Sequence, residues 1–90
     1  MPHYRIIVYG MVQNVNFRYN IAGFANDHGI NGYVKNLPDK TVEIYFIGSE
    51  VLLEKFKNFI KRNPGYSKVS QIKIIELEKH QKFDSFQILY

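Results

Sequence analysis

The chain has 90 residues, no cysteine and a formal net charge of +4. This length suits one domain, expected over residues 1–90, and the lack of cysteine excludes disulfide bonds, thiolate catalysis and a cysteine-bound zinc ion. Hydrophobic residues make up 46% of the chain and aromatic residues 16%, a composition typical of a globular protein rather than a disordered one. The longest apolar run, residues 6–9, is too short to span a membrane, and the absence of cysteine favours a cytoplasmic location. The positive charge suits an anionic ligand, either a phosphate or a nucleic acid.

The chain begins with a predicted strand, a loop and a helix. Weak alternation and β-branched residues over Tyr4–Tyr9 predict the strand, and the polar segment Gly10–Asn16 follows it. Apolar residues at helical spacing predict a helix over Phe17–His28. Gly29 is a typical residue just past the end of a helix.

A hairpin is predicted next. Residues alternate between apolar and polar over Ile30–Asn36 and again over Thr41–Ile47, which predicts two strands. Between them, Leu37–Lys40 contains a proline and an aspartate, both of which favour turns. The two strands should therefore pair.

The rest of the chain predicts a second helix and two more strands. Ser49 is suited to cap the helix, which carries an apolar stripe and ends at Asn63–Gly65. Val69–Leu77 predicts a strand, with a possible bulge where the apolar parity changes between residues 74 and 75. Within Phe83–Tyr90, alternation predicts a short last strand.

The predicted order is βαββαβ plus a C-terminal strand. This order predicts an α+β, ferredoxin-like sandwich, in which a mostly antiparallel sheet carries two helices on one face. Because this fold hosts enzymes and binding modules alike, the function has to be argued from a site.

The loop between the first strand and the first helix is the strongest candidate for a site. The first N–H groups of a helix lack backbone partners, and the helix dipole adds positive potential there, so an anion is the natural occupant. Arg18, in the first turn, carries a planar set of donors that matches two phosphate oxygens. An arginine in this position is also a common solvated surface residue, so the loop alone leaves both interpretations open.

Two sequence blocks resemble a known family. The first reads Gly10-x-Val12-Gln13-x-Val15-x-Phe17-Arg18, and the second reads Gly29-Ile30-x-Gly32-Tyr33-Val34-Lys35-Asn36-Leu37-Pro38-Asp39. Both are similar, in order and spacing, to the signature blocks of the acylphosphatase family, and the likeness extends from Tyr4 to Tyr90. The resemblance implies the fold predicted above and the hydrolysis of carboxyl-phosphate anhydrides to a carboxylate and inorganic phosphate.

The resemblance also implies roles for particular residues. Arg18 and Asn36 would be the catalytic residues, with Arg18 on the phosphate and Asn36 orienting the attacking water. The phosphate would be held by the loop, mainly through backbone N–H groups, at Gln13, Asn14, Val15, Asn16, Phe17 and Arg18. No metal or other cofactor is implied, and the three histidines are scattered along the chain. The expected partner is a small acyl phosphate, with no nucleic acid or membrane, and the expected state is a monomer.

The sequence departs from the family pattern at four positions. Asn14 replaces the usual glycine; a left-handed backbone there accepts asparagine, whereas a glycine-only conformation would strain the loop. Asn16 occupies a variable position. Lys40 and His28 replace a usual glycine and leucine, and we expect both to affect stability rather than catalysis.

Three other interpretations remain. A relative that binds phosphate or acyl phosphate without turnover would follow if Asn14 strains the loop. A ferredoxin-like RNA-binding module would need exposed rings on the central strands, which Tyr9, Tyr33 and Tyr45 could supply, although the usual basic-glycine-aromatic pattern is absent. A module of a larger carbamoyl-transferring protein is less expected for a chain of this length. The sequence does not distinguish among acyl phosphates.

Overall fold

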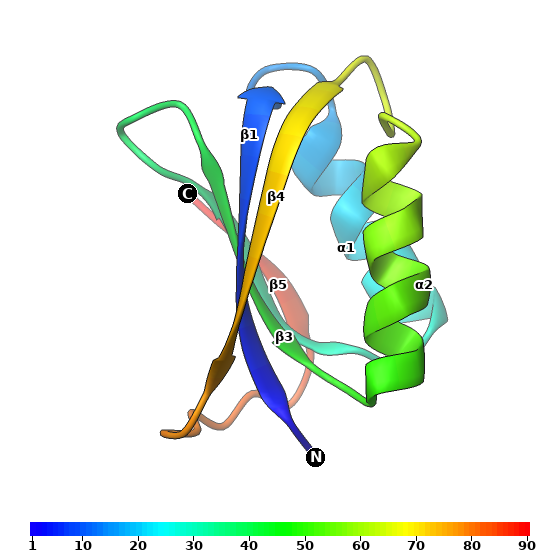
Figure 1. Ribbon diagram of the computed structural model, residues 1–90, viewed down its shortest axis with the longest axis vertical. Coiled ribbons are helices and arrows are strands. Elements are labelled where there is room, and N and C mark those ends of the chain that lie inside the picture. The colour runs from blue at the N-terminus through cyan, green and yellow to red at the C-terminus, as the bar shows by residue number, and fades with distance from the viewer.

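The computed structural model describes all 90 residues of the chain. Its elements in chain order are β1 (His3–Met11), α1 (Phe17–Asp27), β2 (Asn31–Asn36), β3 (Val42–Ile47), α2 (Glu50–Lys61), β4 (Lys68–Leu77) and β5 (Phe86–Leu89). Both helices lie on the same side of one twisted sheet (Figure 1). The predicted order of strands and helices is therefore confirmed.

The five strands form a single sheet in the order β4-β1-β3-β2-β5. Four of the strands pair antiparallel, and only β5 runs parallel to its neighbour β2. This is the predicted ferredoxin-like sandwich with an added C-terminal strand. The parallel pair brings Leu89 beside Lys35, so the last strand ends next to the residue before Asn36.

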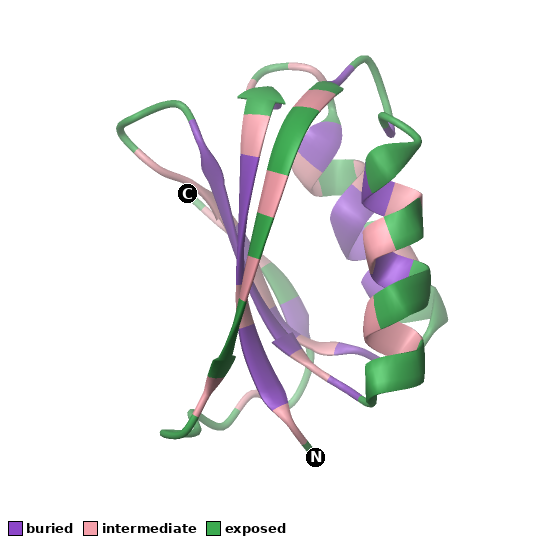
Figure 2. Ribbon diagram, in the orientation of Figure 1, coloured by how far each residue is buried: buried purple, intermediate pink, exposed green.

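The core lies between the sheet and the two helices. Alternate residues of β1 and β3 point toward the helices, as the period of two requires. Figure 2 shows buried residues along the central strands and on the sides of the helices that face the sheet. The fully buried large side chains are Phe17, Phe46, Phe56, Ile6, Ile21, Ile30, Ile44, Ile60, Val8, Val12, Val34 and Val42.

Both helices begin and end for local chemical reasons. Ser49 caps α2, because its hydroxyl accepts a hydrogen bond from the Leu52 N–H at 3.2 Å. α1 ends at Asp27, one residue earlier than predicted, with His28 as its C-cap. Gly29 follows with a left-handed φ of +66°. The His28 ring stacks on Phe24 at 4.0 Å and bonds the Phe24 carbonyl, so His28 has a structural role.

The predicted bulge at residues 74 and 75 is wrong. The pairing of β4 with β1 is regular there, and the register shifts instead between Tyr9 and Gly10. Gly10 has a φ of +124°, and a Cβ at this position would lie 2.1 Å from the Lys68 carbonyl oxygen. The alternation of apolar residues changes at this point for a simpler reason. Ile74 faces the helices, whereas Ile75 points to the other face of the sheet and is 52% exposed.

The last strand begins at Phe86, later than the start of the predicted alternating segment at Phe83. Phe83 belongs to the preceding connection, where its ring packs against Tyr33 and Tyr45 with centroids 5.6 and 5.1 Å away. This connection crosses the face of the sheet that the helices leave open.

Candidate active site

The loop between β1 and α1 has an unusual backbone. Asn14 and Asn16 both adopt left-handed conformations, with φ of 61° and 62°. Asparagine is the residue that tolerates this conformation best after glycine. Asn14 is therefore accommodated in place of glycine, and the conformation that would have strained the loop is not the one adopted. Left-handed residues in such loops turn backbone N–H groups toward a common side, where an anion binds.

Arg18 lies in the first turn of α1 and is held from the far end of the chain. Its Nη1 donates a hydrogen bond to the Leu89 carbonyl at 3.0 Å. Its guanidinium carbon lies 4.8 Å from the centroid of the Tyr90 ring. These contacts use one donor and one face of the guanidinium, so several donors stay free for an anion.

A hollow of about 340 Å³ opens beside this loop. Its lining residues are Val12, Asn14, Asn16, Phe17, Arg18, Tyr19, Ile88 and Tyr90. Four of the predicted phosphate-binding residues thus surround one hollow, together with two residues of the C-terminal segment. Gln13, Val15 and Asn36 do not line it.

Gln13 has a contact that the sequence did not predict. Its side-chain amide donates to the carbonyl oxygens of Leu37 and Thr41, both at 2.9 Å. These two residues begin and end the turn between β2 and β3, and the Leu37 N–H also donates to the Thr41 carbonyl. Gln13 therefore joins the phosphate loop to the turn that follows Asn36.

Asn36, the last residue of β2, lies between two segments that are tied to the loop. Lys35, just before it, pairs with Leu89, whose carbonyl holds Arg18, and Leu37, just after it, is bonded by Gln13. The Oδ1 atom of Asn36 is buried and has no hydrogen-bond partner within the protein. A buried acceptor without a partner is uncommon and is one sign of a functional side chain.

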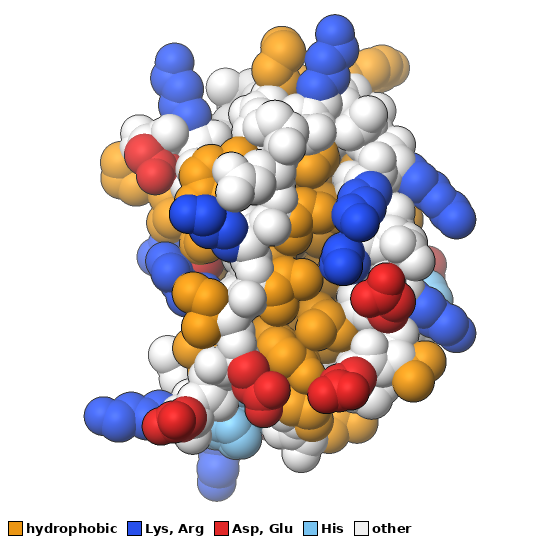
Figure 3. Space-filling model, in the orientation of Figure 1, with side chains coloured by type: hydrophobic (Ala, Val, Ile, Leu, Met, Phe, Trp, Pro, Cys, Tyr) orange, Lys and Arg blue, Asp and Glu red, His pale blue; other side chains and the backbone are white.

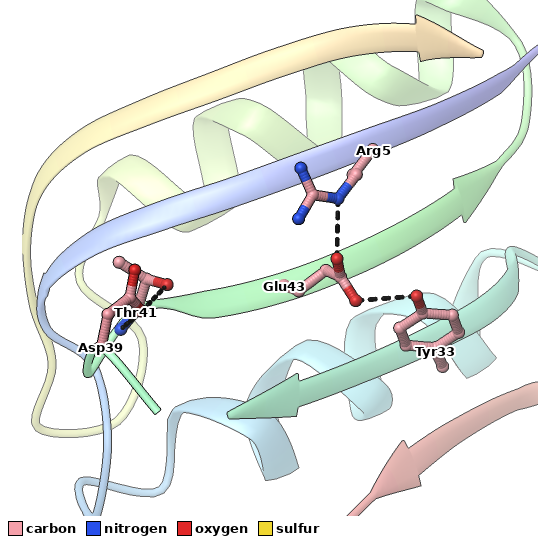
Figure 4. Close-up of polar contacts among 5 residues, drawn as sticks. All are labelled: Arg5, Tyr33, Asp39, Thr41 and Glu43. Atoms are coloured by element: carbon pink, nitrogen blue, oxygen red, sulfur yellow. Dashed lines mark hydrogen bonds and ion pairs between the residues drawn. The ribbon is translucent and has the colours of Figure 1, made fainter. Parts of the chain in front are cut away.

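Hydrogen bonds between Asp39 and Thr41 close the turn after Asn36. The backbone N–H and the hydroxyl of Thr41 both donate to Asp39 Oδ1, at 3.0 and 2.5 Å (Figure 4). These hydrogen bonds hold the pKa of Asp39 below its usual value. Lys40 lies between Asp39 and Thr41 with a φ of 74°. This left-handed conformation suits the glycine that the family pattern usually has at this position.

A second polar cluster lies on the open face of the sheet, away from the loop. Glu43 accepts hydrogen bonds from Arg5 at 2.7 Å and from the Tyr33 hydroxyl at 2.8 Å (Figure 4). Burial raises the pKa of Tyr33 to about 12, and the bond to Glu43 adds to the shift. Burial opposes ionisation of Glu43, but the bonds from Tyr33 and Arg5 outweigh it and lower the pKa of Glu43. The cluster is internally satisfied.

Two of the three tyrosines that an RNA-binding module could use, Tyr33 and Tyr45, are engaged within the protein. Tyr45 is only 3% exposed, its ring lies against Phe83, and its hydroxyl is bonded by His3 and by the Gln81 N–H. Tyr33 is held by Glu43. The geometry therefore weighs against the RNA-binding module.

Another hollow of about 460 Å³ lies between α2 and β4, and it contains none of the predicted site residues. Figure 3 shows apolar side chains along it, with basic residues near one end and acidic residues near the other. No group of three or more histidine, aspartate or glutamate side chains is placed to hold a metal ion. None of the helices has the length and apolar character needed to cross a bilayer.

Comparison with known proteins defines the family. The model of the acylphosphatase family matches residues 4–88. An acylphosphatase of Archaeoglobus fulgidus is 41% identical over 85 residues, which cover 94% of each chain. An acylphosphatase of Bacillus licheniformis is 41% identical over 90 residues, which cover 100% of each chain. The crystal structure of acylphosphatase from Bacillus subtilis superposes with a TM-score of 0.93 at 39% identity, covering 100% of both chains.

The chain belongs to the acylphosphatase family. It is a hydrolase of that family, as the two sequence blocks predicted, and its fold is the one seen in the Bacillus subtilis enzyme.

Proposed function

We propose that the chain hydrolyses small acyl phosphates through the loop at residues 13–18, Arg18 and Asn36, by in-line attack of water and without a metal ion. Water attacks the phosphorus, the bond between phosphorus and the acyl oxygen breaks, and the products are a carboxylate and inorganic phosphate. The proton of the attacking water leaves with the phosphate or to solvent. The observation that carries the proposal is the buried, unpartnered Oδ1 of Asn36 in a segment tied to the loop by Gln13.

The leaving group explains why so few side chains suffice. The conjugate acid of a carboxylate has a pKa of about 4, so the group leaves without protonation by a general acid. The phosphoryl group passes through a loose transition state with charge on its outer oxygens, and positioning with electrostatic stabilisation supplies most of the catalysis.

Arg18 supplies the charge in this proposal. Its bond to the Leu89 carbonyl holds the guanidinium in place before substrate arrives. A group fixed in advance stabilises the transition state without the cost of reorganisation. The backbone N–H groups of the loop supply the other donors to the phosphoryl oxygens.

Asn36 supplies the position of the nucleophile. An amide oxygen that lacks a protein partner can accept a hydrogen bond from a water molecule and so hold its lone pair toward the phosphorus. The strand pairing on one side and the Gln13 bonds on the other limit the movement of Asn36.

We also keep the predictions of a cytoplasmic location and a monomeric state. The prediction of location rests on the absence of cysteine.

The test is the hydrolysis of benzoyl phosphate in EDTA by the parent protein and two arginine variants. Arg18→Ala should abolish turnover and weaken inhibition by inorganic phosphate. Arg62→Ala, which removes an exposed arginine after the last turn of α2, is the matched control and should behave like the parent.

The outcomes separate the proposed function from its main alternative. Equal turnover by both arginine variants would remove Arg18 from the mechanism. Binding of inorganic phosphate without any turnover by the parent would favour the relative that binds acyl phosphate but does not hydrolyse it. Loss of activity in EDTA that is restored by Mg²⁺ would overturn the metal-free mechanism.

A further inference from the structure

A third hollow, of about 450 Å³, adjoins the one beside the phosphate loop. Tyr19, Ile88 and Tyr90 line both, so the two spaces form one groove. The second part runs between α1 and β5, and its remaining lining residues are Ala22, Gly23, Asn26 and Phe86. We refer to this part as the acyl groove.

The acyl groove follows from the spacing of residues on α1. Tyr19, Ala22, Gly23 and Asn26 stand at positions i, i+3, i+4 and i+7, so they share one face of the helix. With a rise of 1.5 Å per residue, the face from the first to the last extends for about 10 Å. The opposite wall is the β5 strand, where Phe86 and Ile88 point toward α1 because their partners on β2 are the buried Gly32 and Val34.

The chemistry of the lining is apolar. Five of its seven residues are hydrophobic, and none has a charged side chain. At the junction with the phosphate site, the rings of Tyr19 and Tyr90 are exposed, so they offer apolar surface against which a hydrocarbon chain can pack. Gly23 leaves the centre of the groove open, since a Cβ there would meet nothing within 4 Å.

We propose that this groove binds the hydrocarbon part of the substrate and makes the enzyme selective for acyl phosphates with medium-length alkyl chains. The inference rests on the proposed function, because it requires the phosphoryl group in the loop at residues 13–18. The shared residues Tyr19 and Tyr90 then lead the acyl chain away from Arg18 and along α1. An acyl group that ends in a carboxylate or a second phosphate finds no positive charge in the groove.

The test compares acetyl phosphate with hexanoyl phosphate, whose anhydrides are electronically alike. Burying one methylene completely is worth about 0.8 kcal/mol. Hexanoyl phosphate has four more methylenes than acetyl phosphate, and if each is half-buried in the groove, its kcat/KM should be roughly tenfold higher. In Gly23→Leu the leucine should fill the groove, and the preference for hexanoyl phosphate should fall at least fivefold. Inhibition by inorganic phosphate, measured in parallel, reports whether the phosphate loop is intact in this variant.

Lys55→Leu, which adds a leucine to the exposed side of α2, is the matched control and should keep the preference of the parent. Equal kcat/KM for the two substrates in the parent would overturn the acyl groove and leave the proposed function intact. A preference that Gly23→Leu does not change would also overturn it, because the chain would then bind elsewhere. No hydrolysis of either substrate would overturn the proposed function, and the acyl groove with it.

Discussion

Gly65 lies against the phosphate loop, and replacing it with alanine tests whether the position of that loop controls activity. Its φ is +68°, and an ideal Cβ would lie 2.6 Å from the Val15 carbonyl oxygen. The N–H of the next residue, Tyr66, already donates to that oxygen at 2.9 Å. A methyl group must therefore displace the Val15 carbonyl by about 0.4 Å to reach the 3.0 Å below which Cβ contacts are essentially never found.

Two effects of Gly65→Ala are expected. A left-handed backbone costs a residue with a Cβ roughly 1–2 kcal/mol of stability, and each kcal/mol lowers the melting temperature of a domain this small by about 4–8 °C. A misplacement of about 1 Å at an active site can cost on the order of 10² in rate, so the smaller displacement of the loop should lower kcat/KM on the order of tenfold.

Gly29→Ala is the matched control. Gly29 has a φ of +66°, but a Cβ there would meet nothing within 4 Å. It should lose stability as Gly65→Ala does and keep the kinetic constants of the parent.

The assay is the hydrolysis of benzoyl phosphate, at a temperature where both variants are folded by circular dichroism, together with competitive inhibition by inorganic phosphate. Weaker phosphate inhibition in Gly65→Ala alone is the expected pattern. If both variants keep full kcat/KM while losing stability, the contact between residue 65 and Val15 does not govern the position of the loop.

Three other predictions follow from the site and from the open face of the sheet. Arg18→Lys should lose most activity, since one point charge cannot replace the planar donors, and near-normal turnover would contradict this role. Asn36→Ala should lower kcat by a factor on the order of 10², with little change in melting temperature or in inhibition by phosphate, because Asn36 Oδ1 has no protein partner. An equal loss of phosphate affinity would show instead that Asn36 is a binding residue. His3 is buried and stacked on His80 at 3.7 Å, and burial, then His80 and the terminal amine, lower the pKa of His3. The unfolded chain therefore takes up a proton at His3 more readily than the folded chain once the pH falls below about 6.5, so stability should fall from pH 7 to pH 5. Thermal melting should show a smaller fall for His3→Gln.

Local pattern was enough to predict the elements of the fold. The alternation over Thr41–Ile47 and the capping serine before α2 act over a few residues, so their effect can be seen in the sequence itself. The predicted bulge failed because the pattern of β4 was considered without its partner strand. What shifts the register is the close approach of Gly10 to the backbone of β4, which depends on the pairing.

The catalytic roles of the site residues stay predictions, and the contacts around them that the sequence did not predict are non-local. The family pattern identified Arg18 and Asn36 as candidates, and the structure places Arg18 at the hollow and Asn36 in the adjoining strand. The side-chain bonds of Gln13 and the contact of Gly65 with Val15 join residues 24 or more positions apart. No periodicity or spacing reports such contacts.

The bond between Arg18 and Leu89 joins residues 71 positions apart, and it has a consequence for folding. The guanidinium is fixed only when β5 has paired with β2, and that strand has just four residues at the edge of the sheet. A partly folded chain with β5 detached would retain most of its secondary structure, yet its Arg18 would lack the Leu89 carbonyl. Return of hydrolysis during refolding would then report the docking of this last strand, and would follow the recovery of helical signal measured by circular dichroism.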